Sequence, residues 1–247
     1  MDKEQFFKAC ESEQLRKGIG TLSEKTLHVV LKNYFEPHHE NHEIKVGGYV
    51  ADIVGESGII EIQTRQFNKL LKKLQAFLEV CDVTIVFPIA QLKWLYWIDL
   101  ETGETSPKRK SPRKGMPFEI FFELYKIKRL LKNPRLKLCI CMLEIEEYRY
   151  LNGWSKDKKK GSSRCDRIPT DIFEEIYINN IFDYKKLIPI GLAEKFTSKD
   201  FAKSSKLTVS RSQTALNILN YLEIVTRVEK KGNSFIYKIN KTGLQDL

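Results

Sequence analysis

Hydrophobic and polar positions follow two different periods along the first 150 residues. Apolar residues recur every three to four positions in some segments, which predicts helices with one buried face. In other segments they alternate or form short runs, which predicts strands, and the run at residues 83–89 is apolar enough to be buried on both faces. The predicted helices cover residues 22–35, 70–78 and 118–131, and the predicted strands cover residues 43–54, 59–64, 83–89, 94–99 and 136–145. This order of elements indicates a mixed α/β domain over residues 1–150.

The last 50 residues follow a separate pattern. Thr197 and Asp200 have the spacing of a capping box, and they open a short predicted helix that ends near Lys206. Thr208 can cap a second helix with a single apolar stripe, and two alternating strands flank a basic turn at residues 229–233. Helix, turn, helix and a two-stranded basic wing resemble a winged helix-turn-helix domain.

This resemblance sets the expected domain boundaries and implies a contact with DNA. We expect the winged helix at residues 193–247 and a basic connecting region at residues 151–192, with a helix around residues 171–178. The second helix of a winged helix enters the major groove with its N-terminal residues foremost. The residues off its apolar stripe and on the wing that can reach phosphates or base edges are Ser210, Arg211, Gln213, Thr214, Lys230 and Lys231. The alternative is a winged helix that contacts protein.

The charge balance also favours a polyanionic partner. The chain has 247 residues, with 42 Lys and Arg against 32 Asp and Glu, which gives a net charge of +10. Five basic residues and no acidic one lie at residues 105–115, and six basic residues against two acidic ones lie at residues 155–167. Each run alone could be a solvated loop, but together they indicate one surface for nucleic acid. The candidate contacts in these runs are Lys108, Arg109, Lys110, Arg113, Lys158, Lys159, Lys160, Arg164 and Arg167.

Composition excludes several other classes of protein. Hydrophobic residues make up 42% of the chain, which excludes disorder throughout. No apolar run approaches the roughly 18 residues of a membrane span, and the charged N-terminus argues against a secretory signal. Five cysteines without framework spacing favour a reducing compartment, so we expect a cytoplasmic protein without a membrane partner. Cys139 and Cys141 lie two apart in an apolar strand, and we interpret them as core packing because buried free cysteine behaves as a small hydrophobe.

Two carboxylates form the candidate chemical site. If residues 55–58 make a hairpin turn, Val54 faces Ile59 and Asp52 falls directly opposite Glu61. Opposed side chains on an antiparallel pair have Cβ atoms about 4.5–5.5 Å apart, and like charges there destabilise the sheet. A hard divalent cation such as Mg²⁺ would offset this repulsion, because it binds carboxylate oxygens.

Strand alternation adds two polar groups to this face. Glu61, Gln63 and Arg65 share one face of the predicted strand, opposite Ile60 and Ile62. The polar face would then present a metal ligand, an amide that can orient a water and a guanidinium suited to a phosphate. The alternative is an ordinary half-exposed hairpin of alternating polarity.

An acidic residue on one strand, followed after a short turn by Glu-x-Lys on the next, is the motif of the PD-(D/E)XK nuclease superfamily, the restriction-endonuclease-like fold. The pattern Asp52 … Glu61-Ile62-Gln63 resembles it, with Gln63 in place of the usual lysine, as in some restriction enzymes of the superfamily. An earlier helix often contributes a further acidic residue, and Glu24 is placed to match, or else only caps its helix. The whole chain also resembles an uncharacterised family of clostridial-type proteins with this domain and a C-terminal winged helix.

The nuclease resemblance implies metal-dependent hydrolysis of phosphodiester bonds. Asp52 and Glu61 would hold one or two Mg²⁺ or Mn²⁺ ions, Gln63 would orient the attacking water, and Arg65 would stabilise the developing charge. Double-stranded DNA is the expected partner, held by the winged helix and the basic loops, and a homodimer is compatible with this interpretation. Two alternatives stay open: a non-catalytic DNA-binding regulator on the same scaffold, and an RNA nuclease.

Overall fold

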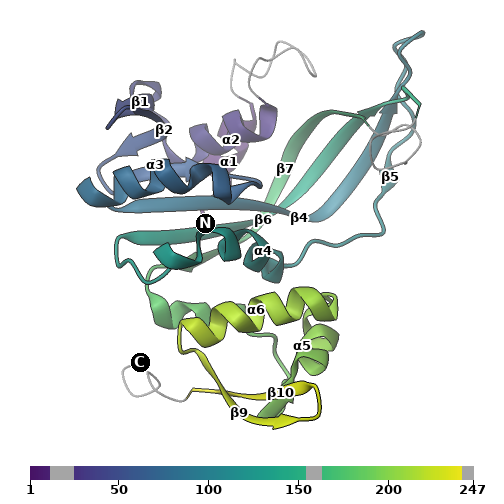
Figure 1. The fold of residues 1–247 in the computed structure, drawn as a ribbon. Coiled ribbons are helices and arrows are strands. Elements are labelled where there is room, and N and C mark those ends of the chain that lie inside the picture. The colour runs from purple at the N-terminus through teal and green to yellow at the C-terminus, as the bar shows by residue number, and fades with distance from the viewer. Residues whose placement is uncertain (12–24, 154–162, 241–247) are drawn as a thin grey trace.

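A computed structural model of the chain describes residues 1–11, 25–153 and 163–240. Its larger sheet consists of β1 His42–Val46, β2 Tyr49–Gly55, β3 Gly58–Ile62, β4 Val83–Ile98, β5 Arg109–Lys110, β6 Leu136–Tyr150 and β7 Ser163–Ile178. Within the described ranges the strand order is β1-β2-β3-β4-β6-β7, and β5 pairs with β4 (Figure 1). The central strands β3, β4 and β6 run parallel, while β1, β2 and β7 join antiparallel. The fold is therefore mixed α/β, as the sequence predicts.

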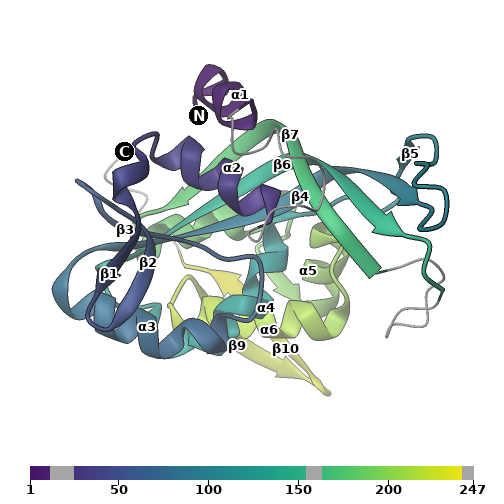
Figure 2. The same cartoon turned by 90° about the horizontal axis from the view of Figure 1, so that it is seen from above.

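Helices cover both faces of this sheet. They are α1 Lys3–Cys10, α2 Thr26–Phe35, η2 His39–Asn41, α3 Phe67–Val80, η3 Pro117–Ile120, α4 Phe121–Leu124 and η4 Tyr125–Leu130. α1 and α2 lie on one face, and α3 and α4 lie on the other (Figures 1 and 2). The alternation along β6 matches this arrangement: Cys139 and Cys141 pack under α1 and α2, whereas Leu138 and Ile140 pack toward α3 and α4.

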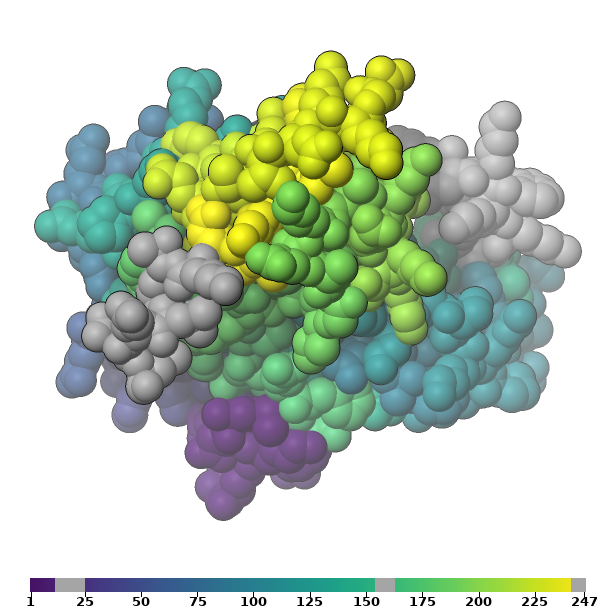
Figure 3. All heavy atoms as spheres, turned by 90° about the horizontal axis from the view of Figure 1, so that it is seen from below, coloured from purple at the N-terminus to yellow at the C-terminus, as the bar shows by residue number. Residues whose placement is uncertain are grey.

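A smaller unit follows the large sheet. Its elements are η5 Ile181–Leu187, β8 Lys195–Thr197, α5 Ser198–Ser205, α6 Val209–Tyr221, β9 Val225–Lys231 and β10 Ser234–Ile239. Both predicted caps are confirmed: Thr197 and Asp200 form a capping box, and the Thr208 side chain accepts a hydrogen bond from the Arg211 amide. The three strands pair in the order β8-β10-β9. Seen from below, these elements, in green and yellow, occupy the middle of that face of the molecule (Figure 3).

The smaller unit shares its core with the rest of the molecule. Leu216 and Phe201 belong to the same buried cluster as Phe121 and Leu124 of α4. The rings of Phe118 and Phe201 meet edge to face, with centroids 6.4 Å apart. α6 is therefore packed between its own small sheet and α4 (Figure 1).

Four predicted elements are joined or divided differently in the structure. The two predicted strands at residues 83–89 and 94–99 are one strand, β4, whose register shifts at a bulge between Ala90 and Leu92. The predicted strand at residues 43–54 is split by Gly47 and Gly48, both at positive φ. The predicted helix at residues 118–131 is a series of short helices with a kink at Ile127.

The predicted helix at residues 171–178 is wrong. These residues belong to β7, which pairs with β6 from Leu138 opposite Ile178 to Tyr150 opposite Ser163. The apolar positions Ile172, Ile176 and Ile178 suit a helical and a strand period alike. The strand forms because it pairs with the backbone N–H and C=O groups along the edge of β6. The predicted connecting region thus contributes a strand to the large sheet. In the described ranges, the structure has no helix long and apolar enough to cross a membrane.

The β2–β3 turn provides a test of the fold. Gly58 has φ +104°, and a Cβ atom added there would lie 2.4 Å from the Asp82 carbonyl oxygen. At Gly55, on the same turn, an added Cβ meets only the flexible end of Glu36, at 3.3 Å. We expect Gly58→Ala to lower the free energy of unfolding by about 2–4 kcal/mol and Gly55→Ala by less than about 1 kcal/mol in equilibrium urea denaturation. Equal effects of the two substitutions would contradict this description of the turn.

Candidate functional site

The β2–β3 hairpin brings the two predicted carboxylates together. Ile53 pairs with Ile60, Val54 with Ile59, and Gly55 with Gly58, which is the register predicted from the sequence. One step further along, the Asp52 amide donates a hydrogen bond to Glu61 Oε1 at 3.2 Å. The Asp52 and Glu61 side chains therefore belong to one site at the end of β3.

Glu61 is the buried member of the pair. Only 2% of the residue is exposed, and its Oε2 atom lies 2.6 Å from Lys73 Nζ, which reaches across from α3. Burial, followed by the negative charge of Asp52, raises the pKa of Glu61 to about 7, and the Lys73 contact only partly opposes this. Near neutral pH, Glu61 can thus take up or release a proton.

Asp52 is held in its ionised form. Burial raises the pKa of Asp52, but the hydrogen bond and charge of His28, the Ile62 amide and Lys73 together outweigh burial and bring it below its ordinary value. The Ile62 amide donates to Asp52 Oδ2 at 2.8 Å. One carboxyl group with a raised pKa and one with a lowered pKa stand side by side, as is common at catalytic centres.

His28 of α2 shows where oxygen ligands converge. Its Nε2 atom lies 3.2 Å from Asp52 Oδ2 and 3.1 Å from the Ile62 carbonyl oxygen. Because both of these oxygens accept hydrogen bonds here, Nε2 carries a proton. Two oxygens thus meet at one positively polarised atom, and Glu61 reaches the main-chain amide of the same Asp52. This donor set of two carboxylates and a main-chain carbonyl suits a hard divalent cation.

Gln63 and Arg65 do not continue the strand. β3 ends at Ile62, and Gln63 Nε2 donates a hydrogen bond to the Arg65 carbonyl oxygen at 2.8 Å. Arg65 is exposed. The last main-chain bond from this segment to β4 is from the Gln63 amide to the Val86 carbonyl, so no ladder holds Arg65 on the face of Glu61. Glu24, the other predicted acidic residue, lies outside the described residues.

A cationic cavity opens next to this site. It has a volume of about 310 Å³, and its lining includes Lys25, His28, Gln63 and Arg167. Burial, followed by the charge of Arg164, lowers the pKa of Arg167 to about 10. The Arg167 Nε atom is buried and has no hydrogen-bond partner among the described residues. A guanidinium of this kind can bind an anion such as phosphate.

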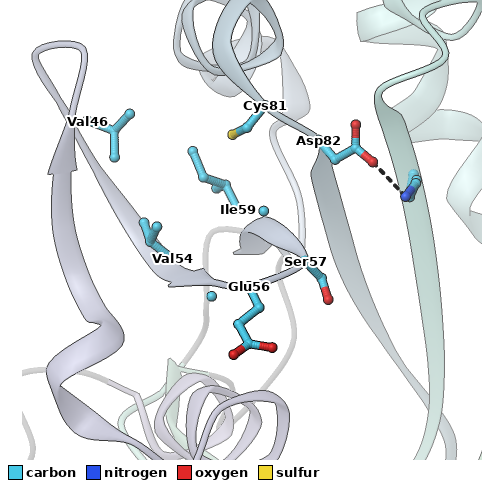
Figure 4. A pocket seen from close by; sticks show the side chains of 10 residues that line it. Val46, Val54, Glu56, Ser57, Ile59, Cys81 and Asp82 are labelled. Carbon is cyan, nitrogen blue, oxygen red and sulfur yellow. Dashed lines mark ion pairs between the residues drawn. The ribbon is translucent and has the colours of Figure 1, made fainter.

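A larger hollow lies at the turn end of the same hairpin (Figure 4). Its volume is about 610 Å³, and Val46, Val54 and Ile59 give it an apolar floor. Its lining includes Glu56, Asp82 and Lys137, and the last two pair with each other at 2.7 Å. Neither carboxylate of the candidate pair lines it, so we do not assign it to the site.

Several predicted nucleic-acid contacts are engaged within the chain. Lys108 contacts Glu146 at 2.8 Å and Arg113 contacts Glu119 at 2.7 Å. Arg164 lies 3.5 Å from the buried Glu147. In contrast, Arg109 and Lys110 of β5 are exposed. The predicted contacts Lys158, Lys159 and Lys160 lie outside the described residues.

The predicted DNA-contacting residues of α6 and β9 differ in how far they are exposed. Ser210 and Gln213 are exposed, and Thr214 is half-buried, with its hydroxyl donating to the Ser210 carbonyl. Arg211 lies over the Phe122 ring at 5.6 Å, so it faces α4 rather than solvent alone. Lys230 and Lys231, on β9, are exposed.

Sequence reasoning missed two residues of the site. Lys73 comes from α3 and His28 from α2, and both reach the hairpin only through tertiary packing. Lys73 lies four residues before Phe77 on a helix with a strong apolar face, so its position at the edge of that face was readable. His28 lies outside the histidine-rich loop at residues 37–42, and no local spacing connects it with Asp52.

The raised pKa of Glu61 leads to a stability prediction. A carboxyl group whose folded pKa exceeds its ordinary value stabilises the fold below about pH 4.5, and this contribution is lost as the pH rises through about 7. In the presence of a chelator, we expect the free energy of unfolding of wild type to fall by about 2–3 kcal/mol between about pH 5 and pH 8, relative to Glu61→Gln. Urea denaturation at each pH measures this difference. Parallel curves for the two proteins would show that Glu61 does not titrate in this range.

Comparison with known proteins gives a family for this chain. It is 28% identical over 226 residues to an uncharacterised protein of Treponema pallidum (strain Nichols), and the match covers 91% of this chain and 89% of that protein. No solved structure matches the fold significantly. The profile of the family described as "Domain of unknown function (DUF8091)" matches residues 25–179, a range that includes α2, the β2–β3 hairpin, α3 and β7. The chain therefore belongs to the DUF8091 family.

Proposed function

We propose that this protein is a metal-dependent nuclease that hydrolyses DNA at the site formed by Asp52 and Glu61. The observation that carries the proposal is the convergence of Asp52 Oδ2 and the Ile62 carbonyl oxygen on His28, with Glu61 alongside. His28 and Lys73 compensate the negative charge of the two carboxylates, and a bound cation could replace one of these contacts. The cavity lined by Arg167 and Lys25 adds a place for a phosphate group.

The residues present fit Mg²⁺ or Mn²⁺. Asp52, Glu61 and the Ile62 carbonyl would hold the ion, and His28 would give up its contacts with Asp52 and with this carbonyl. When bound, such an ion polarises the scissile phosphate and lowers the pKa of a bound water. Glu61 must be deprotonated to act as a ligand, so metal affinity rises as the pH passes about 7.

Lys73 supplies the positive charge that Gln63 lacks. In the nuclease motif that the sequence resembles, a lysine stands where this chain has Gln63. The ammonium of Lys73 reaches the same carboxylate from α3, at 2.6 Å, and its side chain is 18% exposed. We assign to Lys73 the stabilisation of negative charge that develops on the phosphate. Gln63 lines the phosphate cavity, where its amide can orient a water, and the exposed Arg65 can contact the nucleic-acid backbone.

We also propose that residues 193–247 act as a winged helix that holds duplex DNA. The exposed Ser210 and Gln213 of α6 and the exposed Lys230 and Lys231 of β9 support a DNA-contacting surface. Packing of α6 against α4 favours the second candidate, in which this unit contacts protein, here the larger part of its own chain. In that case, the protein would be a regulator on a nuclease-like scaffold.

Cleavage assays separate these functions. With Mg²⁺ or Mn²⁺, we expect wild type to cut plasmid or structured DNA, and a chelator to stop the reaction. Asp52→Ala, Glu61→Ala and Lys73→Ala should each lower the rate by about 100-fold or more, because each removes charge at the reacting centre. Lys72→Ala is the matched control, since Lys72 is the exposed neighbour of Lys73 on α3, and it should cut normally. Duplex binding without any cleavage would favour the regulator, and cleavage of RNA alone would favour an RNA nuclease.

The wing has its own test. Replacing Lys230 and Lys231 with alanine should weaken duplex binding by about tenfold and reduce the slope of log affinity against log salt by about 2, because each phosphate contact contributes about 0.9. Fluorescence anisotropy at several salt concentrations measures both quantities. The control, Lys8→Ala with Lys45→Ala, removes the same charge from α1 and β1 and should leave the slope unchanged. An equal loss of duplex affinity in both double variants would mean that binding depends on the net charge of the protein and not on the wing.

A further inference from the structure

A second group of potential ligands lies in the core beneath α1. Cys139 and Cys141 of β6 and Glu175 of β7 each offer one ligand atom, and these atoms all lie within 4.8 Å of one another. Cys141 is directly opposite Glu175 in the ladder between the two strands. Both cysteines are fully buried, and the Glu175 side chain is 4% exposed.

The two sulfur atoms have the spacing of metal-bound thiolates. Cys139 Sγ and Cys141 Sγ are 3.7 Å apart. In a tetrahedral zinc site with Zn–S bonds of about 2.3 Å, two thiolate sulfurs are about 3.8 Å apart. A disulfide would instead require about 2.05 Å, so the two cysteines are not positioned for that bond. Positions two apart on an extended strand share a face, which is what brings both sulfurs to the same side.

Glu175 supplies the observation that hydrophobic packing does not explain. Its Oε1 atom is buried and has no hydrogen-bond partner among the described residues. Its Oε2 atom lies 3.2 Å from the Met1 amino group. An unsatisfied polar atom in the core costs about 1–3 kcal/mol, and more when the group is charged. A cation bound between Oε1 and the two thiolates would remove that cost.

We propose that Cys139, Cys141 and Glu175 bind one Zn²⁺ ion that ties β6 to β7 beneath α1. Two thiolates and a carboxylate are ligands that zinc accepts, and the fourth position of the tetrahedron is left for a water or another small ligand. On binding, the two thiols release their protons, and two S–Zn bonds and one O–Zn bond form, with no change of oxidation state. This site is separate from the nuclease site, because its ligands lie on β6 and β7, whereas Asp52 and Glu61 lie on β2 and β3.

X-ray absorption spectroscopy on the full-length wild-type protein tests the proposal without any variant. After loading with Zn²⁺ under reducing conditions and desalting, we expect about one zinc per chain with two sulfur neighbours at about 2.3 Å. Zinc surrounded only by nitrogen and oxygen, or less than about 0.1 zinc per chain, would overturn the proposal.

Variants assign the sulfur ligands. The double substitution Cys139→Ala with Cys141→Ala should remove the sulfur neighbours, and Glu175→Gln should weaken zinc binding by about tenfold or more while keeping them. The matched control is Cys81→Ala with Cys165→Ala, two half-buried cysteines outside the cluster, and it should bind zinc as wild type does. Loss of the sulfur signal in this control, and not in the Cys139 and Cys141 variant, would place the metal elsewhere.

Discussion

The register of the β2–β3 hairpin is the constraint on which the candidate site depends. Gly55 and Gly58 close the turn, and the ladder continues to Ile53 opposite Ile60. Asp52 and Glu61 come next, where the Asp52 amide donates to Glu61 Oε1. Two carboxylates in this position repel each other, and the fold offsets the repulsion from both sides of the sheet. Lys73 approaches from α3 and His28 from α2. Two of the helices that cover the sheet, α2 and α3, therefore also complete the site.

The same arrangement shifts the pKa values of the two carboxyl groups in opposite directions. Glu61, fully enclosed and next to the charge of Asp52, has its pKa raised to about 7. Asp52 receives an amide hydrogen bond and a histidine contact, and its pKa falls. A site that is partly protonated and internally paired at neutral pH is stable without metal, but it can exchange a proton and a histidine contact for a divalent cation. This exchange links the stability of the fold to the function that we propose.

Local pattern predicted those parts of the structure that local interactions determine. The caps at Thr197 and Thr208 and the hairpin register were all readable from residue spacing, because neighbours along the chain satisfy them. The contacts of Lys73 and His28 with the hairpin could not be predicted, because they arise only through tertiary packing. The helix predicted at residues 171–178 failed for a related reason: its apolar positions fit two periods, and the unpaired edge of β6 selected the strand. The expected role of Arg65 on the Glu61 face depended on a strand that ends at Ile62.

Binding of Mn²⁺ tests the central claim most directly, because it requires neither a substrate nor the C-terminal unit. Titration of the protein with Mn²⁺ near pH 8, followed by electron paramagnetic resonance of the free ion, measures the affinity of the oxygen site. If Asp52 and Glu61 are the ligands, wild type binds Mn²⁺, and Asp52→Asn and Glu61→Gln each weaken binding by about tenfold or more, while both variants stay folded. Equal Mn²⁺ affinity in all three proteins, or no binding by wild type, would contradict the assignment of this carboxylate pair as a metal site.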